Sequence, residues 1–184
     1  MVTGVLSAVD LAAVRADFPQ ISESGLFSVS ETIYGPAFGK LIEDIRSREF
    51  QSVMEKKYGV DLADKPMVIS VCSWKPHRVG HVLMDCPDEL PTCLLFLNKI
   101  FDDRGGCLSV LRANNDPGDD VAEIPLSGGT LASFLSADGS WHERDPDNGE
   151  LQWLRLSWRA QKSCGDGVAE GIDQRNTVRS EGAS

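Results

Sequence analysis

The side chains that could carry out chemistry in this sequence are few, with three histidines and five cysteines among 184 residues. The cysteines are odd in number and show neither a CxxC pair nor the spacing of a structural zinc site, so we expect reduced thiols rather than a disulfide framework. Lone thiols of this kind usually serve in packing. They stand at Cys72, Cys86, Cys93, Cys107 and Cys164.

The chain divides into two parts with different sequence patterns. These patterns predict the helices and strands that must position any reactive group. In the first 60 or so residues, apolar residues recur every three or four positions from Pro36 to Met54, which predicts helices that Gly59 ends. Beyond Pro66 the sequence changes to short β-type runs separated by turn residues. These runs span 67–74, 79–84, 92–100, 107–112, 129–135 and 151–158. We expect one mainly β domain with flanking helices (α+β) over 1–162, with the helices at about 1–60 and a sandwich or barrel at about 66–160.

The overall composition limits the classes of protein to which this chain can belong. Hydrophobic residues make up 41% and charged residues 25%, as in soluble globular domains. The net charge of −10 would repel a phosphate backbone, so nucleic acid is not an expected partner. The N-terminus lacks a signal-peptide pattern and no run of about 18 apolar residues occurs, so we expect a cytoplasmic protein with no membrane partner. Residues 163–184 are polar and predict a flexible tail.

Several short motifs follow one another in the β-rich part: TCLLFLN (92–98), GGCLSVLR (105–112), GTLASF (129–134), SWH (140–142) and a closing Trp158. In order and spacing, over roughly residues 25–158, this series resembles the small prolyl-hydroxylase-like branch of the 2-oxoglutarate and Fe(II)-dependent oxygenases. The resemblance implies a double-stranded β-helix, which is a jelly-roll or cupin-like barrel, backed by the N-terminal helices.

The iron site that the resemblance implies is incomplete. Members of that family hold iron with a His-x-Asp pair and a distal histidine, which leaves positions open for 2-oxoglutarate and oxygen. The resemblance places these ligands at Leu83, Asp85 and His142, and leucine has no lone pair to donate. His81 shares a face of a regular strand with Leu83 and Asp85, but it lies about 7 Å from Leu83 along the strand, so it could replace the missing ligand only through a bulge.

The 2-oxoglutarate site that the resemblance implies is also altered. In the family, a tyrosine in the LLYLN strand and a basic residue six positions before the closing tryptophan bind the distal carboxylate. Here Phe96 lacks the hydroxyl and Gln152 lacks the charge. Strand alternation puts Arg155 on the face opposite Gln152, so Arg155 is not expected to substitute. Neither Fe(II) nor 2-oxoglutarate is therefore an expected cofactor.

The retained carboxylate and imidazole suggest a different chemistry. Asp85 and His142 would still face each other at the barrel mouth, where they are suited to acid–base catalysis. The cavity around them is expected to be lined by Leu83, Phe96, Gln152 and His81. These features predict a cofactor-independent enzyme that performs a cyclisation, isomerisation or elimination on a small organic metabolite or natural product.

Two alternatives stay open at this point. One is an active oxygenase with an altered metal site, in which Asp85, His142 and either His81 or a substrate atom bind the metal. The other is a non-catalytic protein that uses the emptied cavity to bind a ligand or a partner. The sequence indicates neither the substrate nor the oligomeric state.

Overall fold

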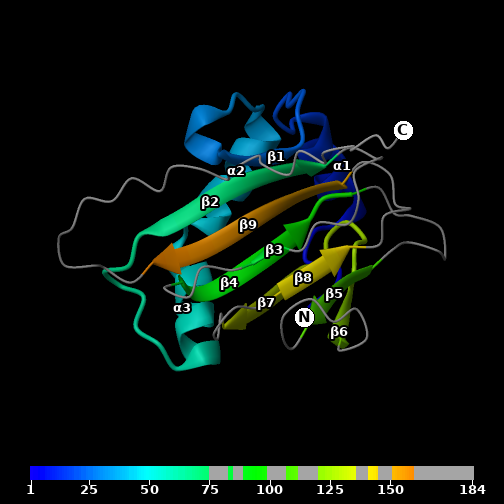
Figure 1. Ribbon diagram of the computed structural model, residues 1–184. Helices are drawn as coiled ribbons and strands as arrows, with labels where there is room; N and C mark the ends of the chain where they lie inside the picture. The colour runs from blue at the N-terminus through cyan, green and yellow to red at the C-terminus, as the bar shows by residue number, and fades with distance from the viewer. Residues whose placement is uncertain are drawn as a thin grey trace, which may run out of the picture.

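The computed structural model describes residues 1–74, 83–84, 89–98, 107–111, 120–135, 141–144 and 151–159. Over these residues the chain forms two antiparallel sheets, and the N-terminal helices lie together against the larger one (Figure 1). The prediction of a mainly β protein with flanking helices is confirmed. The tail predicted at 163–184 lies outside the described residues.

The helices begin and end at residues with clear local roles. They are α1 (Ala8–Ala16), α2 (Pro36–Ile45) and α3 (Arg48–Tyr58), with a short 3-10 turn, η1 (Val29–Glu31), between the first two. Pro36 occupies the start of α2, where its missing N–H costs nothing. Ser47 separates α2 from α3, because its hydroxyl accepts a hydrogen bond from the Phe50 amide as an N-cap. Gly59 ends α3 in the left-handed conformation, with φ of 65°, as predicted.

The larger sheet contains five strands in the order β1-β2-β9-β4-β7. Their bounds are β1 (Gly25–Ser28), β2 (Met67–Trp74), β9 (Leu151–Arg159), β4 (Glu89–Phe96) and β7 (Leu131–Leu135). The β2–β9 ladder runs without a register shift from the Met67–Trp158 pair to the Trp74–Leu151 pair. Side chains therefore alternate regularly between the two faces along the whole of β9.

The smaller sheet contains four strands in the order β3-β8-β5-β6. Their bounds are β3 (Leu83–Met84), β8 (Trp141–Arg144), β5 (Cys107–Leu111) and β6 (Asp120–Pro125). Leu108 and Ile124 of this sheet are buried in one cluster with Phe96 and Trp153 of the larger sheet. The two sheets therefore face each other, and the cluster between them fills the inside of the barrel.

Two separate clusters make up the core, one on each face of the larger sheet. On the outer face, Leu154, Leu156 and Trp158 of β9 pack with the helices. On the inner face, Leu151 and Trp153 of the same strand pack toward the smaller sheet. This division decides which residues of β9 can reach a site inside the barrel.

A buried asparagine ties three segments together where β4 ends. Asn98 is 3% exposed, and its side-chain amide donates to the Leu126 carbonyl at 2.7 Å. Its carbonyl oxygen accepts from the Gln152 backbone amide at 2.6 Å. Both polar groups of this side chain are thus satisfied in the interior, and they hold the start of β9 in place.

None of the helices in the described parts is long and apolar enough to cross a membrane.

Candidate functional site

Leu83 and His142, two of the positions at which the resemblance implies iron ligands, are direct neighbours in the smaller sheet. Leu83 of β3 and Val110 of β5 pair with His142 of β8 from its two sides. Along β5, position 110 has the same parity as Leu108, which is buried between the sheets. The register therefore places positions 83, 110 and 142 side by side across three strands of the smaller sheet.

The described residues do not by themselves complete a metal site. Among them, no group of three histidine, cysteine, aspartate or glutamate side chains is placed to hold an ion. His142 has Leu83 as its cross-strand partner on one side, and leucine offers no donor atom. Asp85 and His81, which the sequence analysis proposes as further ligands, lie outside the described residues.

The inner face of the larger sheet is apolar at one end. Phe96 pairs with Trp153 across β4 and β9, and their ring centroids lie 6.3 Å apart at an angle of 43°. Phe96 is 1% exposed. Cys72, on the other side of Trp153, is also fully buried, and burial raises the pKa of its thiol well above the usual range. This end of the barrel interior holds a neutral thiol and two aromatic rings.

The structure places Gln152 on the other side of the sheet from Phe96. Gln152 lies two and four residues from Leu154 and Leu156 along β9, so its side chain is on the same face as theirs. That face packs with the helices. It pairs with Ser73, a residue on the same outer face. The sequence predicts an inner, cavity-lining position for residue 152, and the regular alternation of β9 corrects that prediction.

Arg155 is the half-buried positively charged residue of β9 on the inner face, whereas Arg159, on the same face, is exposed at the end of the strand. Arg155 pairs with Ser70 of β2 on one side and with Leu94 of β4 on the other. Thr92 and Ser157, both buried, form the next inner pair along the same ladder. The charge of Arg155 opposes the rise in the pKa of the Cys72 thiol. One end of the inner face is therefore polar and cationic.

From the sequence alone, Arg155 is not expected at the site, because Gln152 is assigned to the inward face. A signal for the correct assignment is present in β9, where three large apolar residues, Leu154, Leu156 and Trp158, alternate with Arg155 and Ser157. A face that must cover several helices needs the larger apolar set. The apolar series is thus expected on the outer face, and the arginine on the inner one.

Solved structures of known proteins show the same fold. They include a prolyl hydroxylase from Trichoplax adhaerens in complex with a hypoxia inducible factor oxygen degradation domain peptide (TM-score 0.62, 15% identity, 86% of this chain and 81% of that chain). A 2OG-Fe(II) oxygenase family oxidoreductase from Burkholderia pseudomallei matches with a TM-score of 0.58 and 14% identity, over 86% of this chain and 82% of that chain. HygX from Streptomyces hygroscopicus, with nickel and 2-oxoglutarate bound, matches with a TM-score of 0.54 and 11% identity, over 88% and 82%.

These matches establish that the chain has the double-stranded β-helix fold of the 2-oxoglutarate oxygenases, including the prolyl-hydroxylase-like branch. The resemblance seen in the sequence is confirmed at the level of the fold. No family model and no curated protein matches the chain.

The comparisons contradict the expectation that no cofactor is involved. The structures with this fold are those of 2OG-Fe(II) oxygenases, and HygX holds both a metal ion and 2-oxoglutarate. That expectation depended partly on the lack of a charge at Gln152. Because Gln152 lies on the outer face of the sheet, its lack of charge gives no information about a site inside the barrel.

Proposed function

We propose that this protein is an enzyme of the oxygenase fold that binds 2-oxoglutarate and a divalent metal ion and modifies a small organic molecule. The observation that supports the proposal is the position of Arg155 on the inner face of the barrel, with Ser70, Thr92 and Ser157 as neighbours in the ladder. A guanidinium group beside hydroxyl groups is a suitable donor set for a carboxylate.

The roles of the inner-face residues follow from their positions. Arg155 would bind the distal carboxylate of the keto acid, and the hydroxyls of Thr92 and Ser157 would add hydrogen-bond donors. Phe96 and Trp153 would exclude water from the adjoining end of the barrel. Exclusion of water strengthens each charge-assisted hydrogen bond at the cationic end.

We propose Asp85 and His142 as metal ligands, as the resemblance implies. Leu83 has no donor atom, so the third ligand of the metal would be His81 or an atom of the substrate. When bound together, the metal and the keto acid would activate dioxygen, which is the oxidant for reaction at a substrate C–H bond while the keto acid is converted to succinate and carbon dioxide. His142 and Asp85 would then act as ligands rather than as a free acid–base pair.

A direct test compares two residues on opposite faces of β9. Calorimetric titration of 2-oxoglutarate into the protein with excess Ni(II) should show that Arg155→Met lowers the affinity by roughly tenfold to a hundredfold, which is what charge-assisted hydrogen bonds contribute. Gln152→Met should change it less than twofold. Absence of 2-oxoglutarate binding in the unsubstituted protein would refute the proposal, and the reverse order of the two variants would refute the role of Arg155.

The metal site is tested by restoring the missing donor. Leu83→His should tighten Co(II) binding by roughly a hundredfold, because a direct ligand contributes at least as much as the groups that orient one. Met84→His, on the other face of the same strand, is the matched control and should have little effect. Ligand-field absorption of Co(II) reports both affinities. Equal effects of the two substitutions would show that position 83 does not adjoin the metal.

A non-catalytic protein that binds a ligand in the barrel is a second candidate, and it is favoured by Leu83 at the ligand position. Formation of succinate from 2-oxoglutarate, assayed with Fe(II) and a panel of small metabolites, separates the two candidates. An enzyme of the proposed class forms succinate, and a binding protein does not.

A further inference from the structure

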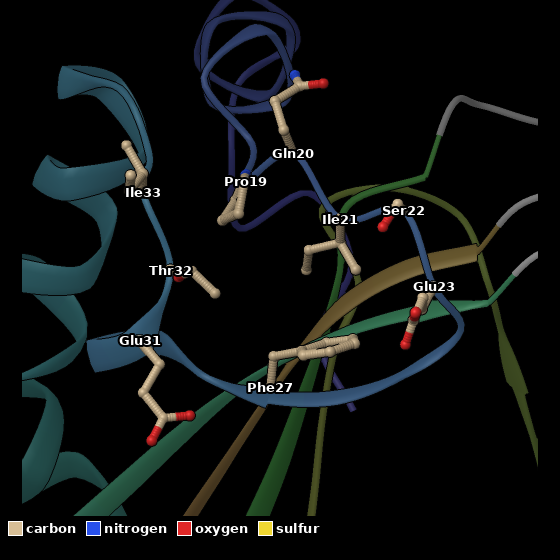
Figure 2. Close-up of a pocket in the computed structure, with 9 residues that line it drawn as sticks. All are labelled: Pro19, Gln20, Ile21, Ser22, Glu23, Phe27, Glu31, Thr32 and Ile33. Carbon is tan, nitrogen blue, oxygen red and sulfur yellow. The ribbon is translucent and has the colours of Figure 1, made fainter.

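A second concave site lies outside the barrel, at the edge of the larger sheet (Figure 2). It has a volume of about 520 Å³, within the usual range for small-molecule sites. Three segments surround it: the loop that follows α1, the strand β1, and the turn η1 with the two residues after it. Its lining residues are Pro19, Gln20, Ile21, Ser22, Glu23, Phe27, Glu31, Thr32 and Ile33.

This pocket is separate from the candidate active site. Phe27 of β1 pairs with Val71 of β2, which belongs to the outer, helix-facing cluster. The pocket therefore opens on the outer side of the sheet, beside its edge strand, whereas Arg155 and Phe96 lie on the inner side. A ligand bound here would not compete with a keto acid in the barrel.

The charged groups of the pocket have one sign. Glu23 and Glu31 are both exposed, and no lysine or arginine is among the lining residues. Within the part of the chain that the structure describes, neither glutamate takes part in an ion pair. Figure 2 shows the two carboxylates on opposite sides of the Phe27 ring. Both glutamates line the same pocket as the Phe27 ring.

The rest of the lining is apolar. Phe27 presents a half-buried ring, and Ile21 and Pro19 line the wall next to it (Figure 2). Ile33 is 93% exposed, which leaves a large aliphatic side chain uncovered at the edge of the pocket. An alkyl stem could cover these surfaces while its charged end remains beside the glutamates.

We infer that this pocket binds a small organic cation, an alkylammonium or guanidinium group on an apolar stem. Each part of the lining has a counterpart in such a ligand. The ring face of Phe27 attracts the cation, the two carboxylates pair with it, and Ile21, Pro19 and Ile33 pack against the stem. This inference does not depend on the function proposed for the barrel.

The test uses three probes with one stem and different head groups: hexylammonium, hexanol and hexanoate. Backbone amide shifts of the full chain in NMR titrations report where and how tightly each binds. Hexylammonium should shift the amides of residues 20–33 and bind at least threefold more tightly than hexanol, and hexanoate should not bind. Equal affinities for hexylammonium and hexanol would overturn the inference, because they would indicate a merely hydrophobic groove.

Variants separate the local carboxylates from the net negative charge of the protein. Glu23→Gln and Glu31→Gln should each weaken hexylammonium binding by about twofold to fivefold, as expected for exposed ion pairs. Phe27→Leu should have an effect of similar size through the loss of the cation–π contact. Glu43→Gln, an exposed residue of α2 outside the pocket, is the matched control and should leave binding unchanged. An equal loss with Glu43→Gln would overturn the inference.

A final titration distinguishes a free ligand from a side chain of another protein. N-acetyl-lysine methylamide carries the same ammonium group on a peptide backbone. Under our inference it binds no more tightly than hexylammonium. If the lysine derivative shifts the amides of residues 20–33 and hexylammonium does not, the inference is overturned. The pocket would then bind a lysine side chain of a protein partner.

Discussion

The two faces of the larger sheet are built from the same strands and differ sharply in what they carry. On the outer face, Leu154, Leu156 and Trp158 of β9 pack with the helices, together with Cys93 and Leu95 of β4. On the inner face, the same two strands present aromatic residues at one end and Thr92, Arg155 and Ser157 at the other. A guanidinium group and buried hydroxyls add little to a hydrophobic core, and the proposed function assigns them to ligand binding.

This comparison predicts that the outer face carries most of the stability. Trp158 is 1% exposed and stacks on Phe50 of α3, with ring centroids 6.2 Å apart. Trp158→Ala should lower the free energy of unfolding by about 3–5 kcal/mol through lost burial and the remaining cavity. Urea denaturation followed by circular dichroism measures the change. A loss below about 1 kcal/mol would mean that the helices do not depend on this face.

The apolar end of the inner face can be tested by adding a hydroxyl. Phe96→Tyr should destabilise the protein by about 1–3 kcal/mol, because the hydroxyl would enter the cluster around Trp153 without a partner. Phe134→Tyr is the control, since Phe134 is only partly buried and its new hydroxyl could reach water. If Phe96→Tyr is neutral and strengthens 2-oxoglutarate binding, the keto-acid site extends to this end of the barrel.

The buried thiol of the outer face predicts a dependence of stability on pH. Burial raises the pKa of Cys93 to about 12, an effect that the nearby charge of Lys57 opposes only partly. In the unfolded chain this thiol loses its proton near pH 9, so the unfolded state binds fewer protons than the folded state between pH 9 and 12. Stability should therefore fall as the pH rises through this window, by about 1 kcal/mol at pH 10 from Cys93.

Denaturation curves at pH 8 and pH 10 measure this effect, with Cys93→Ala as the comparison. The variant is less stable at both pH values because it loses buried volume, but it should lose less stability between them than the unsubstituted protein does. Equal losses would show that Cys93 does not contribute to the pH dependence.

The smallest predicted effect concerns a polar contact at the edge of the outer face. The Tyr58 hydroxyl donates to Ser133 Oγ at 2.8 Å, and the Lys57 ammonium donates to the same oxygen, which together join the end of α3 to β7. Tyr58→Phe should cost about 0.5–1 kcal/mol, the usual net contribution of one hydrogen bond. In a Ser133→Ala background the same substitution should cost nothing further. Additive losses would show that the two hydroxyls act independently.

The identity of the fold followed from local patterns. Helical periodicity before Gly59, turn residues after Pro66 and the ordered motifs up to Trp158 were sufficient, because each depends on residues that are near neighbours in the chain. The family resemblance implied ligand positions at Leu83 and His142, and the β3–β8 register makes these two residues cross-strand neighbours. Their role at a metal site stays a prediction. The proposed ligands Asp85 and His81 stay predictions.

The sequence by itself determined the class of fold, the lack of a donor at position 83 and the presence of an arginine in the last strand. Only the tertiary structure decided which face of that strand looks into the barrel. Shifting the strand by one residue exchanges all of its inner and outer side chains. The alternation in β9 is compatible with either set facing inward until the positions of the helices are known. Packing of Leu154, Leu156 and Trp158 against the helices settles the phase, turning Gln152 outward and Arg155 inward. The acidic pocket is likewise a product of tertiary structure, because the segments that carry Glu23, Phe27 and Glu31 close around it only when β1 pairs with the sheet edge.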